Sequence, residues 1–270
     1  MNNNNGFSPF AELLPPFFKA HSEDQCWICD SSVNLSQEHR IKASYIRRQF
    51  GDQGMFIGTA NSLGHVYKIA QSSKSKHLKF PPSICHKCNT STTQHSDLSY
   101  DLFVRSAEEK ARSGVHPQEA LEDNYFLDKN NFLALFRYFA KLMGCHLHES
   151  GVPIPLHLAR FVAQQTDRNC IWLSTCLNPG LSISVEPEGF AAHGGLVTIT
   201  KEPTLHPIRF HSARMIGSIR MIFWYDMTSL EIWEMRLRFP DFVERCARKA
   251  CETMKSPTRE RDLKWLGLRE

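Results

Sequence analysis

The sequence predicts an α+β protein of two units, and three observations support this class. The chain has 270 residues, more than one domain usually needs. Its first part carries two widely spaced CxxC pairs. Its second part joins an apolar stripe at helical spacing to several strand-like runs. The polar and acidic segment 113–124 is the expected linker between residues 25–112 and residues 125–270.

The composition is that of an ordinary globular protein with material for a core. Hydrophobic residues make up 41% and charged residues 22%, and the net charge of +4 permits a nucleic-acid partner without requiring one. No apolar run approaches the roughly 20 residues that cross a bilayer. Residues 1–24 begin with an asparagine run and carry no secretory signal. We therefore expect a cytoplasmic protein without a membrane partner, and partial disorder in residues 1–24.

In the first unit, strand patterns and one helix surround the CxxC pairs. The strand candidates are residues 35–41, 55–57 and 65–69. Pro81 and Pro82 bar a regular strand interior before the second pair. The polar stretch from Asn89 supplies capping groups, and apolar residues then recur at helical spacing, so a helix is expected as far as Lys110.

The second unit is predicted to mix helices with strands. The stripe at residues 132–147 indicates an amphipathic helix. Two shorter helices are expected at residues 157–165 and 229–238. The strand candidates are residues 170–177, 181–185, 195–199 and 208–225. The charged end, residues 256–270, is expected to be a surface helix or tail.

The two CxxC pairs, Cys26/Cys29 and Cys85/Cys88, have the spacing of metal-binding knuckles. Each knuckle presents two sulfurs to an ion about 2.3 Å away, so four thiolates can close a tetrahedral Zn²⁺ site. A redox pair is the alternative, but it needs only one CxxC at the start of a helix. The remaining cysteines are expected to be buried free thiols: Cys145, Cys170, Cys176, Cys246 and Cys251.

These motifs resemble the HNH nuclease family of the ββα-metal superfamily. The resemblance covers about residues 25–103 and rests on both cysteine pairs, on Glu38-His39-Arg40 after the first, on Asn89 directly after the second, and on the polar stretch 93–101. It implies a zinc-stapled ββα domain followed by a mixed helix and sheet accessory domain. It also implies an endonuclease that hydrolyses phosphodiester bonds in DNA, in phage defence or mobile-element biology.

The resemblance assigns catalytic roles to three residues. His39 maps to the general base that activates water, a task that suits a neutral imidazole. Glu38 and Asn89 map to oxygen ligands of a catalytic Mg²⁺ or Mn²⁺ ion. Three alternatives stay open: a surface role for His39, a Glu38 side chain on the opposite strand face, and Asn89 as a helix cap. His95 and Asp97 on the following helix are weaker candidates for metal contact or support.

One family feature is missing from the sequence. Members often carry an asparagine that orients the catalytic histidine shortly before the second pair, and residues 79–83 contain none. A backbone carbonyl, Asn61 or His77 could hold the ring instead. The competing interpretations are therefore a catalytically degenerate zinc module that binds nucleic acid or protein, and a redox or zinc-sensing switch.

Basic residues gather near the proposed site, where cations could replace the counterions of a nucleic-acid backbone. They are Arg40, Lys42, Arg47 and Arg48, with Lys74, Lys76 and Lys79. DNA is the expected partner rather than RNA. Residues 125–270 show no catalytic motif, and this part could bind DNA, sense a ligand or hold a homo-oligomer together.

Overall fold

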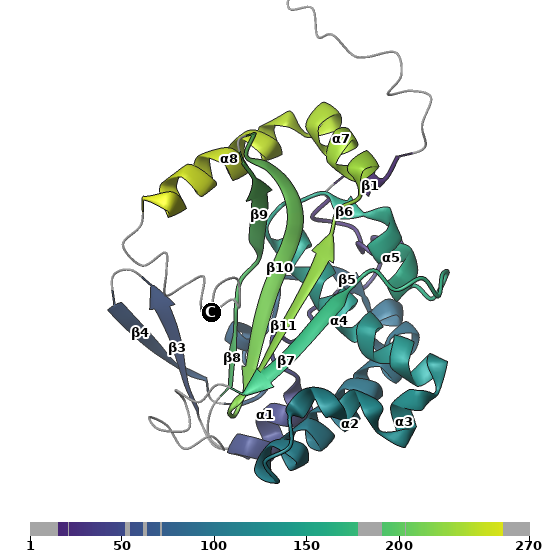
Figure 1. Ribbon diagram of the computed structural model, residues 1–270. Coiled ribbons are helices and arrows are strands. Elements are labelled where there is room, and N and C mark those ends of the chain that lie inside the picture. The colour runs from purple at the N-terminus through teal and green to yellow at the C-terminus, as the bar shows by residue number, and fades with distance from the viewer. Residues whose placement is uncertain are drawn as a thin grey trace, which may run out of the picture.

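The computed structural model describes residues 16–20, 22–51, 55–61, 64–70, 72–177, 191–202 and 204–255 in a mixed α/β fold (Figure 1). Its helices are α1 (Ala43–Phe50), α2 (Gln94–Arg112), α3 (Asn124–Leu127), α4 (Lys129–Glu149), α5 (Leu156–Val162), α7 (Ser229–Arg238) and α8 (Pro240–Met254). Shorter helical turns are η2 (Lys76–Leu78), η3 (Cys88–Thr92) and η4 (Pro117–Glu122). The strands are β1 (Phe18–Lys19), β2 (Leu35–Ser36), β3 (Met55–Asn61), β4 (Gly64–Ala70), β5 (Ile84–Cys85), β6 (Ile154–Pro155), β7 (Trp172–Leu177), β8 (Ala191–His193), β9 (Val197–Lys201), β10 (His206–Ile216) and β11 (Ile219–Asp226).

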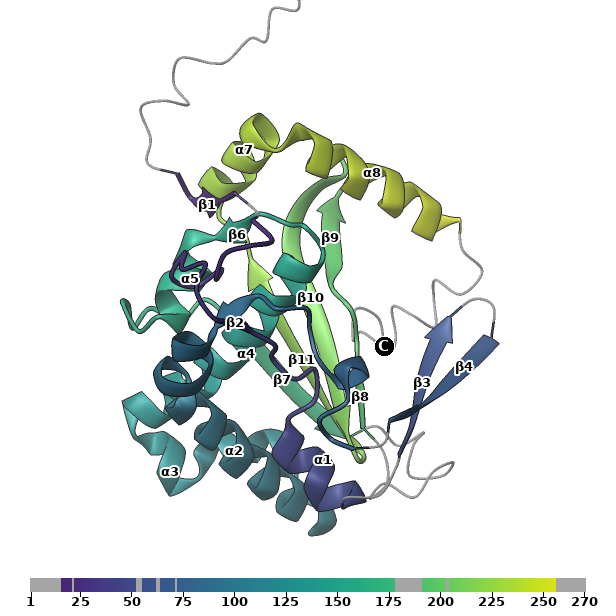
Figure 2. The same cartoon turned by 180° about the vertical axis from the view of Figure 1, so that it is seen from behind.

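An antiparallel sheet forms one layer of the molecule (Figure 1). Its strand order is β7-β11-β10, and β8 and β9 both pair with β10. Strands β10 and β11 pair from Arg209 opposite Asp226 to Ile216 opposite Ile219. Gly217, at a φ of 54°, allows the tight turn between them. Helices α2 and α4 cover one face of this sheet, as the view from behind shows (Figure 2).

Helix α4 is the centre of the core. It is buried almost all round, whereas the sequence predicted an amphipathic helix at residues 132–147. Phe139 packs on Phe223 of the sheet with ring centroids 5.2 Å apart, and Tyr138 stacks on Tyr100 of α2 at 3.9 Å. The helix also buries polar side chains, Lys141 among them, because other segments supply partners for them. A helix enclosed on all sides lacks the solvated face that the pattern indicated.

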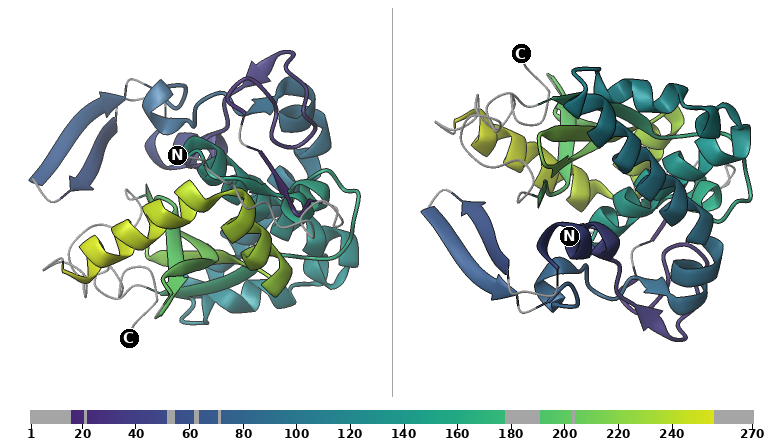
Figure 3. Two further views of the ribbon diagram at one scale, coloured as in Figure 1. Left: turned by 90° about the horizontal axis from the view of Figure 1, so that it is seen from above. Right: turned by 90° about the horizontal axis from the view of Figure 1, so that it is seen from below.

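The strands of the N-terminal part form small antiparallel pairs. Leu35 of β2 lies opposite Cys85 of β5, and the pairing continues to a bridge between His39 and Lys79. Strands β3 and β4 form a hairpin that projects to one side of the molecule (Figure 3). Helix α2 follows β5 through the turn η3. The expected helix after Asn89 and the strands β3 and β4 are therefore present, with both strands longer than predicted, whereas the strand expected at residues 35–41 is limited to β2 and the bridge at His39.

Most predicted elements of the C-terminal part are also present. Strand β7, strand β9 and the hairpin of β10 and β11 match three of the expected strands, and α5 and α7 match the two shorter helices. Helices α1 and α8 were not predicted. The expected disorder of residues 1–15, the strand at 181–185 and the tail at 256–270 lie outside the described residues.

One large hydrophobic core contains residues of both predicted units. Trp27 and Phe80 from the first part share it with Phe139 and Phe223 from the second. The segment expected as a linker contains η4, whose Ala120 is fully buried. The division into two units stays a prediction, and the packing gives both parts a common interior. None of the helices that the structure describes is long and apolar enough to span a bilayer.

Candidate metal centre and histidine site

The four paired cysteines converge on one point. The Sγ atoms of Cys26, Cys29, Cys85 and Cys88 all lie within 4.8 Å of one another, and those of Cys29 and Cys85 are 3.6 Å apart. A tetrahedral zinc ion with bonds of about 2.3 Å needs sulfurs about 3.8 Å apart. This cluster could therefore hold a structural zinc ion, and four thiolates would leave that ion no open position for catalysis.

Hydrogen bonds favour negative charge on one sulfur of the cluster, that of Cys26, whereas burial raises the pKa of Cys29 and the hydrogen bond with Cys26 raises the pKa of Cys88. A hydrogen bond from the Cys88 thiol, together with backbone hydrogen bonds from Cys85, Cys29 and Ile28, lowers the pKa of Cys26 to about 4 against the opposing effect of burial. Because zinc binds the thiolate, a thiol with a low pKa is prepared for the metal at neutral pH.

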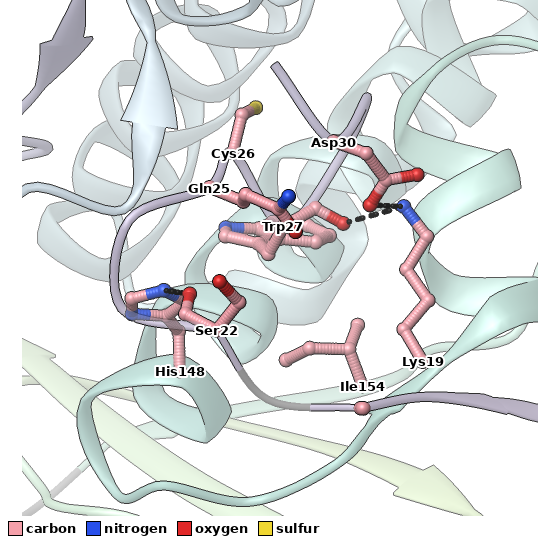
Figure 4. Close-up of a pocket in the computed structure, with 9 residues that line it drawn as sticks. Lys19, Ser22, Gln25, Cys26, Trp27, Asp30, His148 and Ile154 are labelled. Atoms are coloured by element: carbon pink, nitrogen blue, oxygen red, sulfur yellow. Dashed lines mark hydrogen bonds and ion pairs between the residues drawn. The ribbon is translucent and has the colours of Figure 1, made fainter. Parts of the chain in front are cut away.

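The first knuckle is supported from two sides. Its Trp27 is buried directly against Gly144 of α4. On the other side, Lys19 of β1 donates hydrogen bonds to the carbonyls of Trp27 and Ile28, both at 3.2 Å, and pairs with Asp30 at 2.7 Å (Figure 4). The cavity beside these residues has a volume of only about 10 Å³, so it holds at most a water molecule.

Glu38 and His39 engage different partners. Both lie in the extended segment after β2, where His39 forms an antiparallel bridge with Lys79 and the Phe80 N–H donates to the Glu38 carbonyl at 2.8 Å. Successive side chains of a strand point to opposite faces. The Glu38 carboxylate is buried and lies 3.2 Å from the Lys141 ammonium, whereas His39 Nε2 lies 3.1 Å from the Ser73 carbonyl.

The Ser73 carbonyl fixes the tautomer of His39. A carbonyl can only accept a hydrogen bond, so Nε2 carries the proton and the neutral ring presents the Nδ1 lone pair. Burial lowers the pKa of His39, and Lys79 and Arg47 lower it further against the opposing effects of Glu38 and the Ser73 carbonyl. The ring is therefore neutral at pH 7. A backbone carbonyl thus holds the His39 ring, as one of the sequence-based alternatives supposed.

Asn89 bridges the second knuckle to the first strand. Its Nδ2 donates to Ser36 Oγ at 3.2 Å and to the Gln37 carbonyl at 3.4 Å. Within the described part of the chain, its Oδ1 makes no hydrogen bond and is available to a ligand. The side chain caps no helix, since residue 93 precedes α2 as its N-cap.

The fit of Glu38 to a divalent cation is poor. Lys141 is completely buried and places its Nζ 2.8 Å from Asp97 Oδ1 and 3.4 Å from Thr93 Oγ1, in addition to its contact with Glu38. The carboxylate that the resemblance assigns to Mg²⁺ or Mn²⁺ is thus already neutralised by an ammonium group. Asp97 belongs to the same network, and His95 bonds to Asn131 at 2.9 Å. Neither contact supports the metal role considered for these two residues.

The predicted nucleic-acid contacts divide into paired and unpaired cations. Three of them form ion pairs within the protein: Arg40 with Glu149, Lys42 with Asp101, and Arg48 with Glu108. The other predicted contacts, Arg47, Lys74, Lys76 and Lys79, form no ion pair among the described residues, and neither does Lys87. Arg47 and Lys79 act on the pKa of His39 and so lie near it. Lys87, which lies between the cysteines of the second knuckle, was not among the predicted contacts.

Three residues of the C-terminal part hold the segment that carries His39, and sequence reasoning missed all of them. Besides Lys141 and Glu149, Arg214 of β10 is buried and donates to the backbone carbonyl of Arg40. The same guanidinium bonds to the hydroxyls of Tyr138 at 2.8 Å and Tyr100 at 3.2 Å. The available signal was a lone charge in an apolar run, which requires a partner when buried.

The site thus combines a cysteine cluster that could hold zinc, an oriented neutral histidine and nearby unpaired cations. Comparison of the chain with protein-family models, with curated proteins and with solved structures found no match. The interpretation of the site therefore rests on its own residues and geometry.

Proposed function

We propose that the protein is a zinc-stapled phosphodiester hydrolase of nucleic acid, with DNA as the expected substrate and His39 as the general base. The observation that carries the proposal is the orientation of His39. Its Nε2–H is held by the Ser73 carbonyl, 3.1 Å away, so the basic Nδ1 is the atom left for a water molecule. The order β2, β5, α2, tied by the cysteine cluster, also has the sequence of elements that the HNH resemblance implies.

In the proposed reaction, Nδ1 of His39 takes a proton from the attacking water. Positioned general bases contribute about 10²- to 10⁴-fold to a rate. Arg47 and Lys79 have no ion-pair partner among the described residues and would face the phosphate charge. The water oxygen then bonds to phosphorus as the phosphorus–oxygen bond to the sugar breaks, the leaving sugar oxygen takes a proton from solvent water, and the proton held by His39 returns to solvent.

A catalytic Mg²⁺ or Mn²⁺ ion does not fit the site as folded. Asn89 offers a carbonyl oxygen, but the Glu38 carboxylate is buried against Lys141. We therefore assign no step to a divalent cation. Zinc in the cysteine cluster would act only as a staple between the two knuckles.

The ion pair between Glu38 and Lys141 favours a second candidate function, a zinc module that binds nucleic acid without cleaving it. An HNH-like site whose acidic residue is neutralised internally has lost one ligand that the resemblance requires. The cations without an ion pair, Arg47 and Lys79 near His39 and Lys87 in the second knuckle, would still bind a phosphate backbone.

Cleavage and binding assays distinguish the two candidates. Supercoiled plasmid and labelled oligonucleotides are incubated with zinc-loaded protein, with and without Mg²⁺ or Mn²⁺. We expect cleavage that falls at least 100-fold in His39→Ala. The matched control is His77→Ala, which replaces an exposed histidine nearby. Equal cleavage by wild type and His39→Ala refutes the proposed base, and binding without cleavage supports the second candidate.

The cations are tested by salt dependence. The logarithm of the association constant for duplex DNA falls linearly with the logarithm of the salt concentration. Loss of two phosphate contacts in Arg47→Ala/Lys79→Ala should make this slope less steep by about 1.8. Arg160→Ala/Arg248→Ala removes two exposed arginines elsewhere and should leave the slope unchanged. An unchanged slope in the first variant would exclude Arg47 and Lys79 as phosphate contacts.

A further inference from the structure

A small oxygen cluster beside the histidine site surrounds a fully buried ammonium group. Glu38 Oε2, Asp97 Oδ1 and Thr93 Oγ1 lie 3.2, 2.8 and 3.4 Å from Lys141 Nζ. They come from two segments: Glu38 follows β2, whereas Thr93 is the N-cap of α2 and Asp97 lies in its first turn. Lys141 reaches them from α4.

The composition of the cluster is that of a cation site. Two carboxylates and a hydroxyl are hard oxygen donors of the kind that bind Mg²⁺ or Mn²⁺. Lys141 supplies one positive charge at the centre. The charge of Lys42 adds to this from outside, because its ammonium bonds to the Asp97 carbonyl and to the Asp101 carboxylate.

The ammonium and a divalent ion exclude each other at this position. A divalent ion would need oxygen ligands at about 2.0 to 2.6 Å, inside the space that Nζ fills. Lys141 is 0% exposed, so the side chain has no open path to solvent in the fold. Removing the ammonium while leaving its partners would bury uncompensated carboxylates.

We propose that Lys141 is the resident cation of the cluster formed by Glu38, Asp97 and Thr93, and that the wild-type chain binds no divalent ion through Glu38. The cluster becomes a divalent cation site only when the ammonium is removed. The proposal concerns the acidic residue beside the proposed general base, but it does not depend on hydrolysis.

Manganese binding to protein without nucleic acid tests the proposal. Free Mn²⁺ is measured by electron paramagnetic resonance during titration of zinc-loaded protein. Wild type and Glu38→Gln should bind Mn²⁺ equally weakly. Lys141→Ala should bind one Mn²⁺ at least tenfold more tightly than wild type, and Lys141→Ala/Glu38→Gln should lose that gain. Arg137→Ala is the matched control, because it removes another buried cation of α4 whose partners are two carbonyls and Asp167.

Two results would overturn the proposal. Binding of Mn²⁺ by wild type that Glu38→Gln abolishes would place a divalent ion at Glu38 in the natural chain. Failure of a folded Lys141→Ala variant to gain Mn²⁺ would show that the cluster is no cation site. If Lys141→Ala does not fold, as judged by circular dichroism, the comparison of wild type with Glu38→Gln decides alone. Since no nucleic acid is present, these results are independent of whether His39 supports cleavage.

Discussion

The contact between Gly144 and Trp27 predicts that one methyl group on α4 will disturb the first knuckle. A Cβ atom at Gly144 would lie 2.6 Å from Cε2 of the Trp27 ring and closer still to two further ring carbons. Real Cβ atoms essentially never come within 3.0 Å of such atoms, so the ring would have to move. Trp27 is only 3% exposed and stands between the sulfur ligands Cys26 and Cys29. Movement of its ring therefore displaces the knuckle.

The expected size of the effect follows from two opposing terms. Overpacking a core costs about 1 to 3 kcal/mol. Replacing glycine by alanine within a helix stabilises the folded state by about 1 kcal/mol. Because several ring atoms clash, we place Gly144→Ala near the upper end, at a net loss of about 2 kcal/mol. In a chain of this size that corresponds to a melting temperature about 4 to 8 °C lower.

The assay is thermal unfolding of the zinc-loaded protein, together with the rate of zinc transfer to a chromogenic chelator. Gly144→Ala should melt earlier and release zinc faster. Gly195→Ala is the control, because nothing lies within 4 Å of its added Cβ. The double variant Gly144→Ala/Trp27→Leu should regain part of the loss. Wild-type melting and zinc release in Gly144→Ala would refute the packing of this indole on α4.

Three further predictions concern the zinc, a buried histidine and a buried arginine. Native mass spectrometry should find one zinc ion bound to the chain. Cys88→Ser should lose this zinc and unfold at a lower denaturant concentration, whereas Cys251→Ser, at an exposed position of α8, should change neither property. Equal zinc retention by the two variants would argue against a zinc site in the cysteine cluster. Burial holds the pKa of His146 well below 6.5, so the folded state stays unprotonated while the unfolded chain takes up a proton. Its contribution to stability is complete above about pH 6.5 and is lost as the pH falls below that value, so urea midpoints measured from pH 7.5 to 5 should decline less steeply in His146→Phe. Arg214→Met should cost about 3 kcal/mol in urea unfolding, because three buried oxygens lose a charged donor. Arg209→Met, at a half-buried position of the same strand that pairs with Asp226, should cost less than about 1 kcal/mol, and equal losses would contradict the role of Arg214.

The sequence predicted local structure and the cysteine cluster well, because both depend on spacing. Two CxxC pairs can share an ion wherever the intervening chain returns, and the sulfurs of Cys29 and Cys85 do meet. The strand and helix patterns around them likewise reflect neighbouring residues. The buried state of α4 was not predicted, since its charged residues were assigned to a solvated face.

The partners of the candidate site could not be predicted, because they are distant along the chain. Lys141 is 103 positions from Glu38, and Arg214 is 174 positions from Arg40. No periodicity links such residues. For the same reason, the sequence could not separate Arg40, which pairs with Glu149, from Arg47, which has no ion pair among the residues described.

The segment Glu38-His39-Arg40 is held by contacts from α4 and β10, so the N-terminal part of the chain cannot keep its structure when it is moved into another protein by itself. A fragment ending at Arg112 would keep all four sulfurs and the imidazole. It would lack the ammonium that neutralises Glu38 and the guanidinium that meets the Arg40 carbonyl. Such a fragment could still bind a metal ion through its four cysteines. The segment that carries His39 would, however, lose the contacts that hold it in place. Recombination in evolution would therefore have to carry both halves together, and substitutions at these contacts should be inherited as matched sets.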